Sequence, residues 1–257
     1  MLARFACLAL LLTACASDDS GGNDGTDSGT AADTAVTASA TDDDGGTLGG
    51  SETGPATGDA TAADSSSGAA GECATEFPAI ITDIDETLTL SDGEFLMQLA
   101  DGTYDPLERE GGAAMVTAYA DLGYRVLYLT ARSETLTTAG TDEPARDATM
   151  RWLVEHGYPT DEASTTLILA PSLVFGDDAA AYKTEALMDM QSMGWRFDYA
   201  YGNADSDIAG YDGAGLDKAT TFIIGPEAGN DGTVAVEGED WLAHTAEHLP
   251  TVPAVCE

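Results

Sequence analysis

From residue 78 onward, short apolar runs rich in β-branched and aromatic residues alternate with helix-like stretches. We expect strands at residues 79–83, 125–130, 166–170, 198–201 and 221–224. We expect helices near residues 112–122, 146–156, 179–193 and 206–213. This alternation is typical of a parallel sheet with helices on both faces. The sequence therefore predicts an α/β fold with a doubly wound, Rossmann-like parallel sheet.

Polar residues of chemical interest follow the ends of these expected strands or lie near the start of an expected helix. In chain order they are Asp83, Asp85, Thr130, Arg132, Lys183, Asn203 and Asp207. Ligands of open parallel sheets gather outside the carboxyl ends of the strands, where neighbouring loops diverge. We therefore expect these side chains to meet at one edge of the sheet.

The first of these positions form an Asp-x-Asp-x-Thr motif, with Asp83, Asp85 and Thr87 directly after an apolar run. An isolated Asp-x-Asp is most often a turn or a solvated acidic edge. Two carboxylates two residues apart at the end of a strand can, however, share one hard cation and one phosphoryl group. Because the other polar positions follow in order behind further strands, the pattern favours phosphoryl transfer.

The order Asp-x-Asp-x-Thr, Thr, Lys and Gly-Asn-x-x-x-Asp resembles the haloacid dehalogenase superfamily. The closer match is to the catalytic domain of lipins, which are phosphatidate phosphatases, and to its counterpart in the large phosphatidylinositol transfer proteins. The stretches similar to that branch are residues 83–85, 124–132, 151–153, 167–172, 201–211 and 221–224. The resemblance covers about residues 78–230, which is nearly the whole predicted folded part.

The resemblance implies a role for each matching position. Asp83 is similar to the nucleophile that forms an aspartyl-phosphate, and Asp85 to the acid/base that protonates the leaving oxygen and later activates water. Thr130 would hold a phosphoryl oxygen, and Lys183 would offset the negative charge of nucleophile and phosphate. Arg132 either reaches the phosphate or pairs with one of the nearby acids.

The same resemblance implies a Mg²⁺ ion held by Asp83, the carbonyl of Asp85, and Asp207, with Asn203 beside them. Many superfamily members carry Asp where this chain has Asn203, and the lipin-like branch carries Asn. Without a cation the acidic cluster would repel an anionic substrate, so the metal is required by the argument. The three histidines show no metal-ligand spacing.

One departure from the lipin pattern bears on the substrate. Lipins carry Gly where this chain has Glu86, whereas acid phosphatases of the superfamily carry Asp-x-Asp-Glu-Thr. About 45 residues separate Asp83 from Thr130, too few for a large inserted cap domain, so we expect an open site. A phosphatidate-like lipid phosphate is the favoured substrate, and a soluble phosphate ester is the rival. A lipid-phosphate binding module without turnover is the alternative from another class.

The front of the chain predicts export. Residues 1–14 hold Arg4 and a short apolar stretch, too short to span a membrane as a mature helix, and read as a signal peptide. Residues 12–15, Leu-Thr-Ala-Cys, resemble a bacterial lipobox, in which Cys15 would be lipidated and would anchor the protein to the cell envelope. Ala16, in place of an aspartate directly after the cysteine, is similar to the residue at that position in lipoproteins sent to an outer membrane. A plain secretory signal with a stray cysteine is the alternative.

Residues 15–72 are dominated by Ala, Gly, Ser, Thr and Asp, with no aromatic residue and no Lys or Arg. Such a segment buries too little apolar surface to offset its ordering entropy, so we expect a disordered acidic tether ahead of a folded domain at residues 73–257. The remaining cysteines, Cys73 and Cys256, lie at the two ends of that domain. In an exported protein they are expected to form a disulfide. Two free thiols are the alternative.

The chain is strongly acidic, with a formal net charge of −37 over 257 residues. From residue 73 onward there are 34 acidic and 8 basic side chains, a net charge of −26, so the tether carries only part of the excess. Such a surface is repelled by nucleic acid and by anionic lipid headgroups. The charge excludes a nucleic-acid partner and leaves a phosphorylated small molecule or lipid.

Overall fold

The computed structural model describes residues 76–255. The predicted signal peptide, Cys15 and the tether lie outside these residues, as do both cysteines of the predicted disulfide, Cys73 and Cys256. Between residues 76 and 255, no helix has the length and apolar character needed to cross a bilayer.

The core is a six-stranded sheet in the order β3-β2-β1-β4-β5-β6, in which every neighbouring pair is parallel. The strands are β1 (Phe77–Thr82), β2 (Arg125–Ser133), β3 (Thr165–Ala170), β4 (Trp195–Gly202), β5 (Thr221–Ile224) and β6 (Val234–Val236). The strand order reverses direction between β1 and β4, which is where open parallel sheets bind their ligands. The predicted doubly wound, Rossmann-like α/β fold is confirmed.

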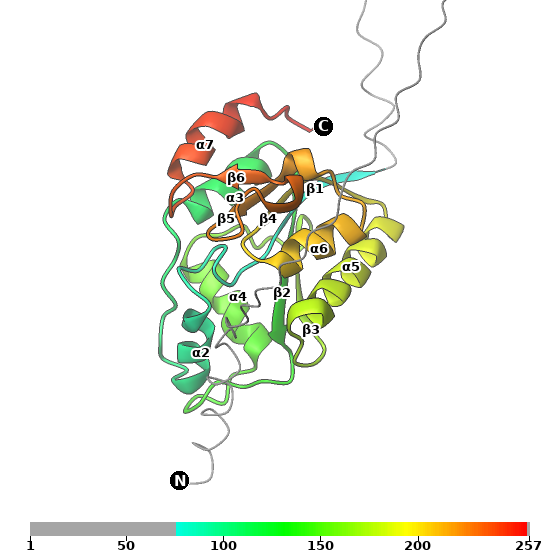
Figure 1. The fold of residues 1–257 in the computed structure, drawn as a ribbon. Coiled ribbons are helices and arrows are strands. Elements are labelled where there is room, and N and C mark those ends of the chain that lie inside the picture. Colours follow the sequence, from blue (N-terminus) through cyan, green and yellow to red (C-terminus); the bar gives the residue numbers. More distant parts are fainter. Residues whose placement is uncertain (1–75, 256–257) are drawn as a thin grey trace, which may run out of the picture. The chain divides into compact units, whose positions relative to one another are not determined.

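Helices cover both faces of this sheet (Figure 1). They are α2 (Gly93–Ala100), α3 (Gly112–Asp121), α4 (Ala145–Glu155), α5 (Gly176–Ser192), α6 (Asp205–Gly213) and α7 (Leu242–His248). Short 3₁₀ turns occupy Lys218–Thr220, Asn230–Gly232 and Leu249–Thr251. Figure 1 shows α5 and α6 on one side of the sheet and α3, α4 and α7 on the other.

The central strands are apolar on both faces because both faces are covered. Along β1, Ile80 packs in the cluster on the side of α3 and α4, whereas Ala79 and Ile81 pack in the cluster on the side of α5. All three side chains are fully buried. Because side chains alternate in direction along a strand, β1 contributes residues to both hydrophobic clusters. The end of β1, and Asp83 directly after it, therefore lie inside the molecule.

The segment between β1 and α3 contains one short helix, α2, and no inserted domain. An antiparallel bridge between Thr89 and Glu108 closes the ends of this segment, and the amide of Leu90 donates to the carbonyl of Leu107 at 2.8 Å. Residues 89–108 therefore form a small flap that carries α2 beside the carboxyl end of the sheet (Figure 1).

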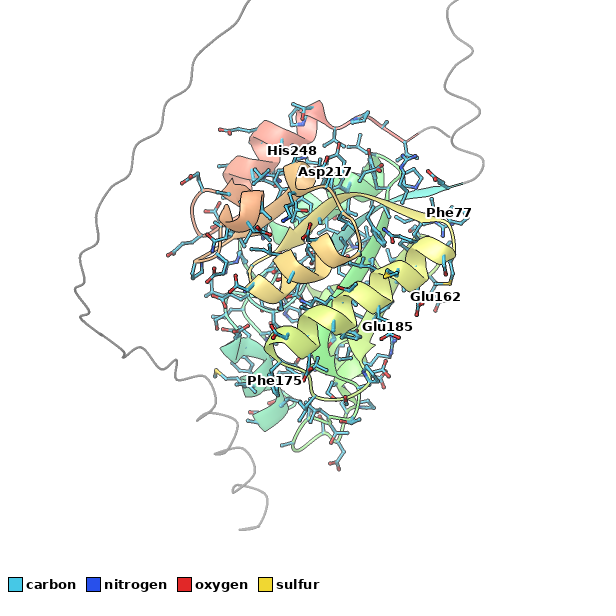
Figure 2. All side chains as sticks on the ribbon, turned by 45° about the vertical axis from the view of Figure 1, so that its right-hand side comes forward. Phe77, Glu162, Phe175, Glu185, Asp217 and His248 are labelled. Atoms are coloured by element: carbon cyan, nitrogen blue, oxygen red, sulfur yellow. The ribbon has the colours of Figure 1, made fainter. Side chains whose placement is uncertain are left out.

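The first and last described residues lie near the start of β2, at the end of the sheet opposite the carboxyl ends of its strands. The Val255 amide donates to the Leu122 carbonyl at 2.8 Å, and the guanidinium carbon of Arg125 lies 3.6 Å from the ring centroid of Phe77. Figure 2 shows Phe77 far from Phe175, which precedes α5 at the carboxyl end of the sheet. Both described ends therefore adjoin residues 122–125, at the edge remote from the candidate site.

Candidate active site

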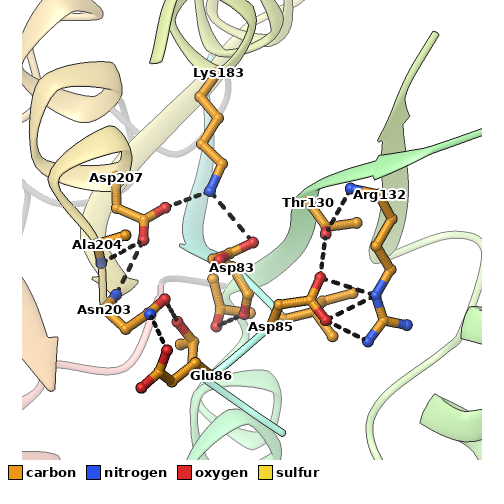
Figure 3. Close-up of polar contacts among 12 residues, drawn as sticks. Asp83, Asp85, Glu86, Thr130, Arg132, Lys183, Asn203, Ala204 and Asp207 are labelled. Atoms are coloured by element: carbon orange, nitrogen blue, oxygen red, sulfur yellow. Dashed lines mark hydrogen bonds and ion pairs between the residues drawn. The ribbon is translucent and has the colours of Figure 1, made fainter. Parts of the chain in front are cut away.

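Asp83 lies directly after β1, and its backbone is fixed by the neighbouring strand. Its amide donates to the Tyr201 carbonyl of β4 at 3.0 Å, and the residue is only 5% exposed. The chain then turns sharply, because the amides of Leu88 and Thr89 both donate to the carbonyl of Ile84. This tight turn brings Asp85 back over the same edge of the sheet as Asp83 (Figure 3).

Lys183 joins Asp83 to Asp207 in the interior of the protein (Figure 3). Its Nζ lies 3.3 Å from Asp83 Oδ1 and 2.5 Å from Asp207 Oδ1, and its side chain is 2% exposed. Burial opposes the charge on Lys183, but the carboxylates of Asp207 and Asp83 outweigh it and raise the lysine pKa above its ordinary value. The lysine is therefore a fixed positive charge beside the predicted nucleophile.

Asp83 is poorly satisfied in this arrangement. Burial raises the pKa of Asp83 to about 8; Lys183 opposes the shift, while Asp207 and Asp85 add to it. Although Lys183 lies close, Asp83 Oδ1 makes no hydrogen bond. Lys183 therefore offsets only part of the cost of burying the Asp83 carboxylate.

Two glycines make this convergence possible. A Cβ at Gly210 of α6 would lie 2.8 Å from the Cβ of Lys183, so glycine lets α6 approach α5 closely enough for the lysine to reach Asp207. A Cβ at Gly202, at the end of β4, would lie 2.6 Å from the Asp207 carboxyl carbon. The glycine of the Gly-Asn-x-x-x-Asp motif thus leaves room for its own aspartate.

Asp207 is also bonded to the backbone that precedes α6. Its Oδ2 accepts from the amides of Asn203 and Ala204, both at 3.0 Å, which satisfies donors at the start of the helix. Both oxygens of Asp207 thus have protein donors, because Lys183 takes Oδ1. Asp207 stays a predicted metal ligand, and the structure adds a role in holding Lys183 and the Asn203 loop.

Asn203 lies beside the loop that follows β1 and is 7% exposed. Its Oδ1 accepts from the Thr87 hydroxyl at 2.9 Å, and its Nδ2 donates to Glu86 Oε2 at 3.4 Å. The threonine of the Asp-x-Asp-x-Thr motif therefore orients the amide of the second motif. The carboxyl ends of β1 and β4 are joined by these contacts.

Asp85 is held by Arg132 and Thr130 (Figure 3). Arg132 Nε lies 3.1 Å from Asp85 Oδ1 and 3.0 Å from Oδ2, Nη2 donates to Oδ1 at 2.8 Å, and the Thr130 hydroxyl donates to Oδ2 at 3.1 Å. Of the two alternatives for Arg132, the structure shows the ion pair. Strand β2 extends through Ser133, so both Thr130 and Arg132 belong to it.

The oxygen atoms gathered here suit a small hard cation. Asp83 supplies a buried oxygen without a hydrogen bond, and Asn203 supplies a nearly buried amide oxygen. Between residues 76 and 255 no three His, Cys, Asp or Glu side chains form a metal cluster. The predicted ligand set does not need one, because it combines carboxylates with a backbone carbonyl and an amide. By the type of its donor atoms, all oxygens, this predicted set is one that Mg²⁺ accepts, although Asp207 and Asn203 also accept protein hydrogen bonds.

Sequence reasoning missed three polar residues near the site. Asp92 precedes α2, and burial raises its pKa to about 6, with Glu86 and Asp85 adding to the shift. Arg109 is 5% exposed, and its Nε and Nη2 donate to the Glu86 carbonyl. Thr149 of α4 accepts from Arg132. The scarcity of basic residues is a signal that could have drawn attention to Arg109, whereas no motif includes Asp92 or Thr149.

A groove of about 390 Å³ lies elsewhere, between α5 and the edge strand β3. It is lined by apolar residues such as Ile168, Pro171 and Met190, together with Tyr182. None of the residues predicted for the site lines it. The groove is therefore separate from the chemistry at the end of β1.

The profile of the family described as "PITM 1-3, LNS2 domain" matches residues 80–225, which is more than half of the chain. The chain belongs to the LNS2 domain family. The match spans β1 to β5 and includes all seven polar positions predicted for the site. The predicted resemblance to the LNS2-type domain of the phosphatidylinositol transfer proteins is confirmed.

Among curated proteins, this LNS2 domain is similar to the human membrane-associated phosphatidylinositol transfer protein 3. The two are 27% identical over 155 residues, which are 60% of this chain and 14% of that protein. The chain thus spans only about a seventh of its relative's length.

Two solved structures are similar to the LNS2 domain at low scores. A putative HAD-like phosphatase from Mesorhizobium loti has a TM-score of 0.47 and 12% identity, with 68% of this chain and 87% of that chain covered. A class C acid phosphatase from Bacillus anthracis has a TM-score of 0.37 and 18% identity, with 53% and 56% covered. At these scores neither structure informs the roles of individual residues.

Proposed function

We propose that this LNS2 domain is a Mg²⁺-dependent phosphomonoester hydrolase that works through an aspartyl-phosphate on Asp83. The observation that carries the proposal is the pairing of Asp83 with a buried lysine beside a second aspartate. Lys183 Nζ lies 3.3 Å from Asp83 Oδ1, and Asp85 follows two residues later on the same edge of the sheet. A binding module needs no acid next to the phosphate, whereas an ester hydrolase does.

Each step follows from the chain's own groups. A carboxylate oxygen of Asp83 attacks phosphorus, the phosphorus–oxygen bond of the ester breaks, and the departing oxygen takes a proton from Asp85. Asp85 then takes a proton from water, whose oxygen attacks the same phosphorus and breaks its bond to Asp83. Lys183 offsets negative charge throughout. Thr130 would donate to a phosphoryl oxygen with the hydroxyl that now bonds Asp85.

Asp83, the carbonyl of Asp85, Asn203 and Asp207 would hold the Mg²⁺ ion. When bound, the ion supplies Lewis-acid stabilisation of phosphoryl oxygens and offsets the carboxylate charge. The raised pKa of Asp83 supports this proposal, because a bound cation would offset the carboxylate charge that Lys183 leaves uncompensated.

A lipid phosphate of the phosphatidate type is the substrate we favour, because the family name and the human relative both belong to phosphatidylinositol transfer proteins. Lipidation of Cys15 in a bacterial envelope, outer membrane favoured, would hold the domain near such a substrate. The net charge of −26 over residues 73–257 opposes contact with anionic membranes. Soluble phosphate esters are therefore tested beside lipid.

A lipid-phosphate binding module without turnover is the second candidate. The observation in its favour is that the human relative is a transfer protein by name. The ion pair between Asp85 and Arg132 is compatible with it, because binding a phosphate requires no proton from Asp85. The two candidates differ in whether phosphate leaves the ligand.

The test is phosphate release by the full chain from p-nitrophenyl phosphate and from phosphatidate micelles, with Mg²⁺ or with EDTA. We expect release that needs Mg²⁺ and that disappears in Asp83→Asn. The matched control is Asp121→Asn, the same chemical change at an exposed residue of α3, which should keep full activity. Tight phosphatidate binding with no release from either ester would contradict the hydrolase and support the binding module.

A further inference from the structure

The guanidinium nitrogens of Arg132 all donate hydrogen bonds to protein side chains. Its Nε and Nη2 face the two oxygens of Asp85, and its Nη1 donates to the Thr149 hydroxyl at 2.9 Å. The guanidinium side chain is 1% exposed. An arginine fixed in this way cannot turn its fork toward a phosphate without first breaking the pair with Asp85.

The surroundings of Arg132 hold it rigidly. The ring of Phe95, on α2 of the flap, lies 4.3 Å from the guanidinium carbon, close enough for a cation–π contact. Thr149 of α4 is fixed in turn, because its hydroxyl donates to the Ala145 carbonyl at 2.7 Å. The Arg132 side chain, which comes from β2, therefore contacts the flap and helix α4, and it also holds Asp85.

The two oxygens of Asp85 are not equivalent. Oδ1 accepts from Nη2 and Nε of Arg132, whereas Oδ2 accepts from Nε and from the Thr130 hydroxyl. A hydroxyl has one proton to donate, so Thr130 serves either Asp85 or a phosphoryl oxygen. When a phosphate takes the Thr130 hydroxyl, Oδ2 keeps only the contact with Arg132 Nε at 3.0 Å, whereas Oδ1 keeps its contacts with both Nε and Nη2.

We propose that Arg132 is a positioning residue that grips Asp85 through Oδ1, so that Oδ2 faces the ester oxygen and delivers its proton there. The inference rests on the proposed hydrolase function. In the step it serves, the phosphorus–oxygen bond breaks, its electron pair goes to the ester oxygen, and that oxygen takes the proton from Oδ2. Arg132 itself touches neither the phosphate nor the leaving group.

The leaving group of the substrate provides a readout that a structural defect does not share. The p-nitrophenolate ion departs without a proton, whereas the alkoxide of glycerol 3-phosphate needs one. We expect Arg132→Lys in the full chain to lower kcat for glycerol 3-phosphate by about 10²-fold, because a point charge cannot replace the fork. We expect kcat for p-nitrophenyl phosphate to stay within about threefold, since its step needs no acid.

Three further variants sharpen the test. Arg132→Ala should behave similarly and should recover activity on the alkyl ester when guanidinium is added. Phe95→Leu, which removes only the ring beneath the guanidinium, should lower the same kcat by a smaller factor. Arg132→Lys added to Asp85→Asn should cause no further loss on glycerol 3-phosphate, because a residue that acts through Asp85 has no effect once the acid is gone.

The matched control is Arg196→Lys, the same change at a half-exposed surface pair with Asp198 and Glu76, which should alter neither ester. Equal losses on both esters, or a raised KM with unchanged kcat, would overturn the inference in favour of a structural or phosphate-binding role. Additive losses in the double variant would overturn it as well. A wild-type chain that hydrolyses neither ester would remove the proposed function, and with it this inference.

Discussion

Glu86 occupies a backbone conformation that residues with a Cβ rarely adopt, with a φ of 55°. The conformation is held in place because the Glu86 carbonyl accepts from Nε and Nη2 of Arg109, at 3.1 and 2.8 Å. Lipins carry glycine at this position, and the positive φ gives a physical reason for that choice. The departure of this chain from the lipin pattern therefore costs backbone strain beside the site.

Glu86→Gly is expected to raise the free energy of unfolding by about 0.5–1 kcal/mol. The substitution removes the strain of a left-handed residue from the folded state, and this effect exceeds the cost of the greater conformational entropy that glycine gives the unfolded chain. Glu86→Ala is the control, since it removes the same carboxylate and keeps the Cβ. Denaturant melts of both variants measure the difference. A Glu86→Gly variant less stable than Glu86→Ala would show that the side chain, and not the backbone, decides stability here.

At the level of single residues, the members of the candidate site could be predicted but most of their contacts could not. Asp83, Lys183 and Asp207 were found because each has a fixed place in the order of motifs, and the structure brings all three together. The partner of Arg132 stayed open because the folded part offers 34 acids to 8 bases. Only the tight turn after Asp83 places Asp85 against this arginine and not another acid.

Among the elements, α7 is tied to the sheet by a chain of hydrogen bonds. The His244 Nε2 contacts the Tyr201 hydroxyl at 3.1 Å, the Tyr201 and Tyr119 hydroxyls lie 2.6 Å apart, and the His248 Nε2 contacts the Tyr119 hydroxyl at 3.0 Å. If both hydroxyl protons are donated within this chain of bonds, one of the two Nε2 atoms must accept, and the histidine that carries it is neutral. Burial lowers the pKa of His244 to about 4, with His248 contributing, and burial also lowers the pKa of His248.

Lowering the pH is therefore expected to weaken the attachment of α7. A histidine whose folded pKa lies below its ordinary 6.5 stabilises the fold above that pH, and the stabilisation is lost as pH falls from about 6.5 toward 4. Because His244 is partly exposed, we expect a loss on the order of 1 kcal/mol. Denaturant melts of wild type and His244→Gln across this range measure it.

The difference between the two proteins isolates the histidine, since carboxylates titrate in both. The wild type should lose more stability than His244→Gln as pH falls, so that the gap between them narrows or reverses. A constant gap from pH 6.5 to pH 4 would contradict this account of α7.

The same end of the chain also supports the site. Trp241, which precedes α7, donates from its indole nitrogen to the Thr87 carbonyl at 2.9 Å, and Arg109 Nη1 donates to the Glu239 carbonyl at 2.7 Å. The loop that carries Asp85 and Glu86 is thus braced by residues about 150 positions later. Neither α7 nor β6 could be predicted from sequence, because elements of seven and three residues are too short to show a clear period.

For the molecule as a whole, the sequence predicted the sheet because its central strands are long and apolar on both faces, as Ile80 and Ile81 of β1 illustrate. Parallel strands must place their carboxyl ends along one edge, so a site built from residues after several strands follows from the fold itself. Helix α2 was not predicted, because the expected helices were located between consecutive strands and this eight-residue helix lies in the flap, ahead of another helix. Its contact with Arg132 could be seen only in three dimensions.

The convergence of the chain ends is a property of the whole domain. Residues 77 and 255 both adjoin residues 122–125. The predicted disulfide between Cys73 and Cys256 stays a prediction, because both cysteines lie outside the described residues.

The most direct test of the account is to trap the phosphate on Asp83. The full chain turning over p-nitrophenyl phosphate with Mg²⁺ is quenched and treated with borohydride, which reduces an aspartyl-phosphate to homoserine, and its peptides are analysed by mass spectrometry. We predict homoserine at position 83, absent without ester and absent in Asp83→Asn. Phosphate release with an unmodified Asp83, or with homoserine at another aspartate, would contradict an aspartyl-phosphate intermediate on Asp83.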